Sequence, residues 1–116
     1  MTASWDTVRE LAQALPEVEE GTGYGRPALR VGGKVFACIG REGHEVLAAR
    51  VGFEERDYLL RAEPDVFFVT PHYANWPWVL VRLPDVDLDA LRDVLTEAWL
   101  FRAPPKLAAS FEPPTT

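Results

Sequence analysis

Cysteine and histidine are scarce in this sequence, and their scarcity excludes several kinds of protein. With a single cysteine, Cys38, the chain cannot close an internal disulfide, which excludes a small disulfide-stapled domain. Cys38 lies in an apolar run, where a free thiol is usually buried and inert. The two histidines, His44 and His72, are far apart in the sequence, and neither accompanies a cluster of metal ligands. We therefore expect no metal centre and no bound cofactor.

Long hydrophobic runs are absent as well. No apolar stretch approaches the roughly 20 residues that cross a bilayer, and no basic segment followed by an apolar one precedes the first helical pattern. We expect a cytoplasmic protein with no membrane partner. The 116 residues, 47% of them hydrophobic and 26% charged, suit a single globular domain over residues 1–110 followed by a frayed tail at 111–116.

Positive charge is in short supply, yet it is concentrated in one region. The net charge of −6 argues against broad nonspecific binding to phosphate backbones. Residues 21–53 nevertheless carry five basic side chains against two carboxylates, whereas residues 1–20 and 54–65 are acidic. The basic region coincides with the first group of predicted strands, and the acidic regions coincide largely with predicted helices.

Hydrophobic periodicity and turn residues predict three helices and five strands. The first helix is predicted to start after Thr2 or Ser4 and to end before Pro16, with an acidic exit at 17–20 and a glycine-loosened loop at 21–25. The other helices are predicted at 53–63 and from the N-cap Asp87 to about 102, with a short turn at 106–110. The strands are predicted at residues 28–31, 34–39, 45–51, 66–70 and 78–83.

The order of these elements indicates the fold class. Gly32 and Gly33 predict a two-residue β-hairpin, because both glycines accept positive φ angles without a Cβ clash. The element order is α-βββ-α-ββ-α, with hairpin-length connections between consecutive strands. We therefore predict an α+β fold in which helices pack on one face of an antiparallel sheet of about five strands.

The segment between the last two predicted strands, residues 71–78, is the best candidate for a contact surface. It is too aromatic for a solvated linker, and two prolines exclude a helix. The residues predicted to contact a ligand or partner are His72, Tyr73, Asn75, Trp76 and Trp78. In one reading the polar side chains hydrogen-bond a ligand while Trp76 stacks on it. In the other, Tyr73 and Trp76 fold back onto the sheet and His72 points to water.

Basic residues on the predicted strands supply a pattern typical of nucleic-acid binding, because cations interleaved with aromatic rings can contact phosphates and stack on bases. The predicted nucleic-acid contacts are Arg26, Arg30, Lys34, Arg41 and Arg82, with Tyr24 near the first of them and Trp78 near the last. The alternative is that these side chains are ordinary solvent-facing charges on the uncovered side of a sheet.

Catalytic chemistry has little support in the sequence. No serine lies near a histidine, and Cys38 has no base in its own segment. We therefore predict that the protein is not an enzyme. The acidic set Glu17, Glu19 and Glu20 could bind a hard cation weakly, although such sets are more often solvated helix ends.

Several short motifs, weak alone, are fairly specific in their order and spacing. They are Leu15-Pro16-Glu17, Tyr24-Gly25-Arg26-Pro27, Gly33-Lys34-Val35-Phe36-Ala37, Pro71-His72-Tyr73, Trp78-Val79-Leu80-Val81 and Ala103-Pro104-Pro105-Lys106. Through these motifs the chain resembles the MmcQ/YjbR family of small bacterial proteins over nearly its whole length. The resemblance implies a CyaY-like α+β fold and a DNA-binding role through paired hairpins, and it implies no catalytic residues.

These observations support one leading function and two alternatives. The leading prediction is a small non-catalytic binding module that binds DNA through a basic sheet face and hairpin tips. The first alternative is a protein-interaction or homodimerising module that uses the aromatic 71–78 loop. The second is an acidic metal binder that resembles frataxin.

Overall fold

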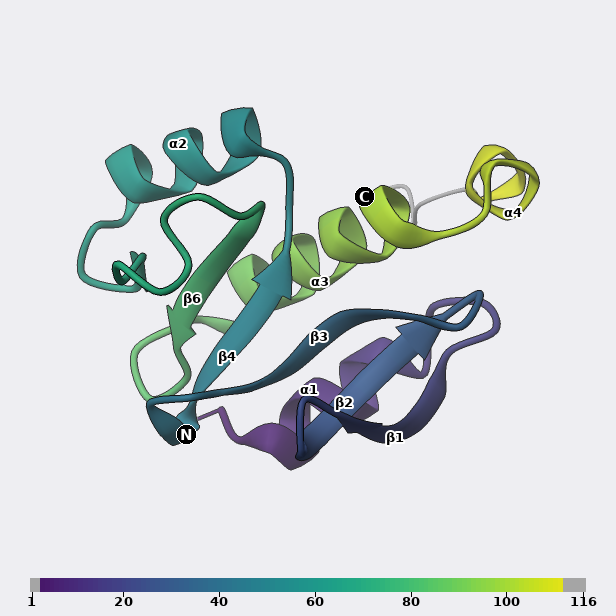
Figure 1. The fold of residues 1–116 in the computed structure, drawn as a ribbon, viewed down its shortest axis with the longest axis horizontal. Helices are drawn as coiled ribbons and strands as arrows, with labels where there is room; N and C mark the ends of the chain where they lie inside the picture. Colours follow the sequence, from purple (N-terminus) through teal and green to yellow (C-terminus); the bar gives the residue numbers. More distant parts are fainter. Residues whose placement is uncertain (1–2, 112–116) are drawn as a thin grey trace.

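The computed structural model describes residues 3–111, which form four helices and six strands (Figure 1). The helices are α1 (Trp5–Ala12), α2 (Phe53–Ala62), α3 (Leu88–Arg102) and α4 (Pro105–Ser110). The strands are β1 (Glu19–Gly23), β2 (Arg26–Val31), β3 (Lys34–Gly40), β4 (Gly43–Arg50), β5 (Phe67–Phe68) and β6 (Trp78–Arg82). Within the described residues, no helix is both long and apolar enough to cross a membrane.

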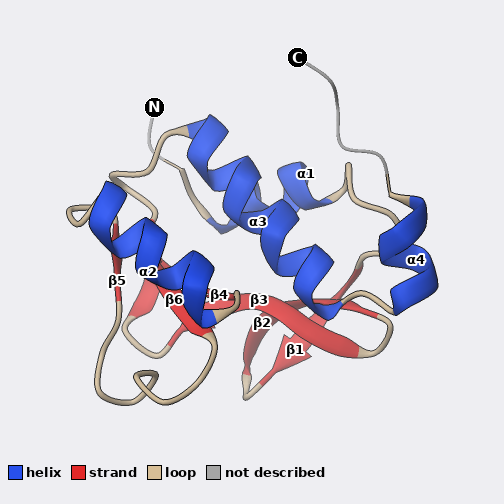
Figure 2. Ribbon diagram, turned by 90° about the horizontal axis from the view of Figure 1, so that it is seen from above, coloured by secondary structure: helices blue, strands red, loops and turns tan. Residues whose placement is uncertain are grey.

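All six strands belong to one antiparallel sheet with the order β1-β2-β3-β4-β6-β5. The first four strands form a meander. The chain then forms α2 and adds β5 and β6 to the same sheet, with β6 beside β4. Figure 2 shows α1 and α3 above the sheet and α2 and α4 toward its two ends on the same side. The predicted α+β class, the antiparallel pairing and the one-sided helix layer are therefore confirmed.

One strand was not expected from the sequence. The segment predicted as an acidic exit and a glycine loop instead forms the edge strand β1, which pairs with a β2 that begins at Arg26 instead of residue 28. The prediction was wrong because β1 has no large apolar side chain, so its pairing rests on backbone hydrogen bonds. Tyr24 and Gly25, with φ of 57° and 77°, close the hairpin as a two-residue turn.

The predicted Gly32-Gly33 hairpin is confirmed, with φ of 58° and 79° between β2 and β3. A Cβ on Gly32 would lie 2.7 Å from Pro104 Cγ, so the turn also needs a glycine for lack of space. The strands predicted at residues 66–70 and 78–83 also pair with each other, as β5 and β6. However, β5 is only two residues long instead of the five predicted at 66–70.

The helix ends follow local chemistry. The Ser4 side chain caps α1, and Asp87 Oδ1 accepts a hydrogen bond from the Ala90 backbone N–H at 2.8 Å, as predicted for α3. The first helix ends at Ala12, three residues before the predicted end, because the chain turns at Leu15, whose N–H bonds to the Ala12 carbonyl. The predicted turn at 106–110 is the short helix α4.

Two apolar clusters lie on opposite faces of the sheet. The larger one fills the space between sheet and helices, with Trp99 of α3 fully buried at its centre. Trp99 Nε1 donates a hydrogen bond to the Pro16 carbonyl at 2.9 Å, which joins α3 to the segment after α1. The Phe111 ring, predicted as the start of a frayed tail, packs on Trp99 with a centroid distance of 4.9 Å. The rest of that predicted tail, residues 112–116, lies outside the described residues.

The smaller cluster lies on the face without helices, which we call the open face. Its members come from four strands and from the loop between β5 and β6: Ala28, Val35, Cys38, Ala48, Tyr73, Trp78 and Leu80. In Figure 2 this loop descends on the side of the sheet opposite the helices. The aromatic loop predicted as a contact surface therefore covers part of the open face.

Candidate ligand-binding site

The register of the sheet determines which side chains share the open face. Arg50 of β4 lies opposite Trp78 of β6, and Val46 lies opposite Arg82. Because side chains alternate along a strand, every second residue of β2, β4 and β6 projects to this face. The cross-strand pair of Arg50 and Trp78 is in contact, with the guanidinium carbon 5.2 Å from the ring centroid.

A cavity of about 530 Å³ opens on this face, between the β1–β2 turn, the β3–β4 turn and the aromatic loop. Its described lining consists of arginines, rings and one thiol: Tyr24, Arg26, Cys38, Arg41, Arg50, His72, Tyr73, Trp76 and Trp78. No carboxylate is among these lining residues, although the whole chain carries −6. The cavity is therefore a locally cationic and aromatic site in an acidic protein.

Three arginines supply the positive charge of the cavity. The ion pairs among the described residues involve Arg9 and Arg92, so none of the cavity arginines is neutralised by an ion pair there. Arg26 Nε donates to the Ile39 carbonyl at 2.8 Å, which anchors that side chain to β3. Arg41 is exposed at the β3–β4 turn. An anionic ligand could neutralise these charges without breaking a salt bridge within the described protein.

Arg50 was not singled out from the sequence, yet it has the least satisfied environment of the three. Its Nε is buried and has no hydrogen-bond partner among the described residues. Burial lowers the pKa of Arg50, and the nearby charge of Arg102 lowers it further. The sequence offered no local signal for Arg50, because its place opposite Trp78 depends on the pairing of β4 with β6.

The aromatic residues of the loop divide into buried and exposed rings. Tyr73 and Trp78 are buried, with ring centroids 6.1 Å apart, whereas Trp76 remains 60% exposed at the cavity rim. His72 is exposed, and its ring lies roughly perpendicular to that of Tyr73, with the two ring centroids 4.8 Å apart. The folded-back alternative therefore holds for Tyr73 but not for Trp76. Asn75 is exposed and does not line the cavity.

Arg56 of α2, which was not predicted as a functional residue from the sequence, binds this loop. Its guanidinium is buried and donates to four backbone carbonyls of the loop, at distances of 3.0 to 3.3 Å. The acceptors are the carbonyls of Tyr73, Ala74, Trp76 and Trp78. Because buried carbonyls need partners, this one arginine supplements the backbone hydrogen bonds of the irregular loop, in which the Tyr73 and Trp76 carbonyls also accept from the Trp76 and Trp78 N–H groups. The available signal was an arginine on the inward stripe of a predicted helix, between Phe53 and Leu60.

Cys38 lies in the cavity lining but is only 1% exposed. Burial raises the pKa of its thiol to about 11, an effect that the neighbouring Arg26 partly offsets. The thiol is therefore protonated at neutral pH, which agrees with the inert, buried cysteine expected from the sequence. Burial also raises the pKa of the Tyr73 hydroxyl.

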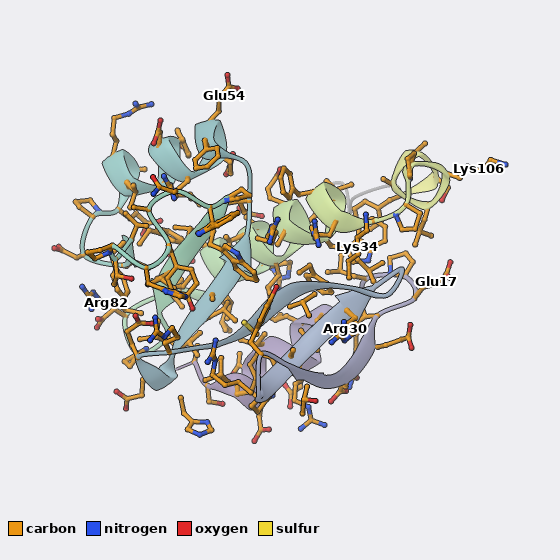
Figure 3. All side chains as sticks on the ribbon, viewed as in Figure 1. Glu17, Arg30, Lys34, Glu54, Arg82 and Lys106 are labelled. Carbon is orange, nitrogen blue, oxygen red and sulfur yellow. The ribbon has the colours of Figure 1, made fainter. Side chains whose placement is uncertain are left out.

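The remaining predicted basic residues do not join the cavity. Arg30, on the open face of β2, donates to the carbonyls of Thr22 and Gly33 at 2.9 and 3.1 Å. The Arg82 guanidinium lies over the Phe68 ring at 4.0 Å, and Lys34 is exposed near the β2–β3 turn. Figure 3 shows Arg82 on one side of the molecule and Arg30 and Lys34 toward the other. The five predicted contacts are thus distributed across the sheet, with Arg26 and Arg41 at the cavity.

The acidic set does not form a common site. Glu20 pairs with Arg9 of α1, Nε to Oε1, at 2.6 Å, whereas Glu19, its neighbour in β1, projects to the opposite face. Within the described residues, no group of three or more histidine, cysteine and acidic side chains could hold a metal ion.

The fold and the cavity together define a class of protein: a single-sheet α+β domain whose helices cover one face and whose other face carries an arginine- and ring-lined site. A family model described as YjbR matches residues 13–101, and the chain belongs to this family. The family predicted from the sequence motifs is therefore confirmed.

Individual relatives agree with this membership. The chain is 34% identical over 126 aligned positions to uncharacterized protein Mb2600 of Mycobacterium bovis and to uncharacterized protein Rv2570 of Mycobacterium tuberculosis, with 94% of this chain and 95% of each relative covered. Among solved structures it is similar to the Deinococcus radiodurans protein DR2400, which carries a DUF419 domain. That match has a TM-score of 0.72 and 21% identity, and it covers 86% of this chain and 78% of the other. This likeness establishes the fold.

Proposed function

We propose that the protein is a non-catalytic binding module that binds a nucleic-acid strand on its open face, with the cavity arginines contacting phosphates. The observation that carries the proposal is the cavity lining, which combines three arginines outside any described ion pair with aromatic rings and includes no described carboxylate. A phosphate backbone supplies the missing negative charge.

Single-stranded DNA fits this site better than a duplex. Aromatic side chains bind bases by stacking only when the bases are not already paired and stacked within a helix. The rings around the cavity include Trp76, 60% exposed, and Tyr24, 66% exposed. Arg30 and Arg82 lie on the same face on either side, where a strand that passes over the cavity could meet them.

The non-catalytic part of the proposal is supported by the chemistry of the lining. Cys38 is the nucleophilic thiol among the described lining residues, and burial raises its pKa to about 11. A nucleophilic cysteine requires the thiolate, which is scarce at neutral pH with such a pKa.

The test is a fluorescence-anisotropy titration of labelled oligo(dT), and of a duplex of the same length, over a range of salt concentrations. For three phosphate contacts the logarithm of the association constant should fall with the logarithm of salt with a slope of about −2 for the single strand. Arg41→Gln, which removes an exposed cation, should reduce that slope by about 0.7. Arg61→Gln, a matched change on exposed α2, should leave it unchanged. Absence of binding at low salt overturns the proposal.

A second function is favoured by one observation, the exposed ring of Trp76 on a loop whose carbonyls Arg56 binds. Exposed, preorganised tryptophans are frequent anchors of protein interfaces. In this alternative, two copies associate through the 71–78 loop. Sedimentation velocity over a concentration series tests it: a dimer that Trp76→Ala converts to monomer supports self-association, and a monomer at every concentration contradicts it.

A further inference from the structure

The β1–β2 turn holds Tyr24 in a backbone conformation that its side chain disfavours. Tyr24 has φ of 57°, in the left-handed region, at the first position of a two-residue turn. Glycine, asparagine and aspartate are preferred at this position because they tolerate positive φ with little strain. The neighbouring Gly25 supplies such a residue at the second position, so the turn itself gives no reason for a tyrosine.

The strained turn places the Tyr24 ring at the wall of the cavity. Its centroid lies 6.2 Å from that of Trp78, with the two planes at 77°. The ring is nevertheless 66% exposed, so it gains little from burial within the protein. Backbone strain at a position that gains little from packing is typical of a residue retained for ligand contact.

One polar atom of the lining also lacks a partner. Arg50 Nε is buried and has no hydrogen-bond partner among the described residues. Arg50 lines the cavity, and its guanidinium lies over the Trp78 ring. Unpaired buried donors are rare in folded proteins, and each calls for an explanation such as a functional role or a bound group. A ligand here should therefore carry hydrogen-bond acceptors as well as a planar ring.

We infer that the cavity is a single-nucleotide subsite, in which one base stacks against Tyr24 at the Trp78 wall and its phosphate meets the cavity arginines. The inference rests on the proposed function and adds which part of the strand enters the cavity. A nucleobase supplies the planar ring and carbonyl acceptors, and its phosphate supplies the negative charge. The cavity volume of about 530 Å³ is within the range of small-molecule sites. The same chemistry is present in a free mononucleotide.

The experiment compares three probes on the wild-type protein: oligo(dT), the same strand with every base removed, and thymidine monophosphate as a competitor. Base stacking on an aromatic side chain should make oligo(dT) bind at least about fivefold more tightly than the abasic strand. Tyr24→Asn should lower affinity for oligo(dT) toward the abasic level and leave abasic binding unchanged. Tyr58→Asn is the matched control, because Tyr58 is similarly exposed but lies on α2.

The outcomes separate this inference from the proposed function. Equal, salt-dependent binding of the normal and abasic strands overturns the nucleotide subsite and leaves strand binding intact. Binding of thymidine monophosphate that Tyr24→Asn weakens, without binding of either strand, supports the subsite and overturns the strand proposal. If Tyr58→Asn weakens binding as much as Tyr24→Asn, the subsite is wrong. Circular dichroism and thermal unfolding of each variant establish that it is folded.

Discussion

Replacing Arg56 by methionine should destabilise the protein more than any other single change in α2, because its buried guanidinium donates to four loop carbonyls, of which those of Tyr73 and Trp76 also accept a backbone N–H. Arg56 is 9% exposed and donates to four carbonyls, three of them through Nη1 at 3.0, 3.2 and 3.3 Å. Since Nη1 carries two protons, we count two to three effective bonds in all.

The magnitude follows from the charge and burial of the clamp. A hydrogen bond to a charged group contributes about 1.5–3 kcal/mol, and a buried partner left unsatisfied costs a similar amount. Packing of the methionine side chain recovers part of this, so we expect Arg56→Met to cost about 3–5 kcal/mol. Arg56→Lys should cost about 2 kcal/mol less than that, because an ammonium group can still donate to some of the carbonyls.

Urea unfolding followed by tryptophan fluorescence measures these changes, since Trp76 and Trp78 report on the loop directly. Arg61→Met is the control: Arg61 is exposed on the same helix, and its loss should cost under about 1 kcal/mol. Amide hydrogen exchange of the loop should accelerate in Arg56→Met, at the Trp76 and Trp78 amides above all. If Arg56→Met costs no more than Arg61→Met, the reasoning about the clamp is refuted.

Three further changes have defined outcomes. Burial raises the Cys38 pKa to about 11, so as pH rises the thiol of the unfolded chain loses its proton before that of the folded protein, and this contribution to stability should be lost between about pH 8.5 and pH 11. Cys38→Ala should flatten this decline of the free energy of unfolding with pH in urea unfolding, and an unchanged pH dependence counts against the raised pKa of Cys38. Tyr24→Asn should change the free energy of unfolding by less than about 1 kcal/mol, because relief of positive-φ strain offsets the lost ring contact with Trp78; a large thermal destabilisation speaks for a structural role instead. Gly32→Ala should cost about 1–3 kcal/mol in the same assay, because the new Cβ meets Pro104 at a positive φ, and a neutral result contradicts it.

The sequence predicted the fold well where side-chain patterns carry the information. Runs of apolar, β-prone residues marked β3, β4 and β6, and Asp87 marked the start of α3. The edge strand β1 was missed because its pairing is purely backbone, and the polar and glycine residues of this segment are typical of a loop. The length of β5 was overestimated, since the chain leaves the sheet after Phe68 to form the loop.

The candidate site was predictable only in part, because it depends on tertiary contacts. Arg26 and Arg41 could be chosen from the basic, ring-rich segment around Tyr24. Arg50 depends on its register opposite Trp78, and Arg56 depends on how α2 meets a loop about twenty residues later in the chain. The position of Arg50 opposite Trp78 has no local sequence pattern, and the stripe of the helix that carries Arg56 does not indicate which loop it meets.

The most direct test of a ligand site on the open face uses the indole N–H signals of the four tryptophans. Oligo(dT) is titrated into ¹⁵N-labelled protein, and each indole signal is assigned by single Trp→Phe variants. We expect the Trp76 and Trp78 signals to shift in proportion to the bound fraction, while Trp99, buried between α3 and the sheet, stays unchanged. A shift confined to Trp5 or Trp99, or no shift at saturating concentrations of the strand, contradicts a ligand site on the open face.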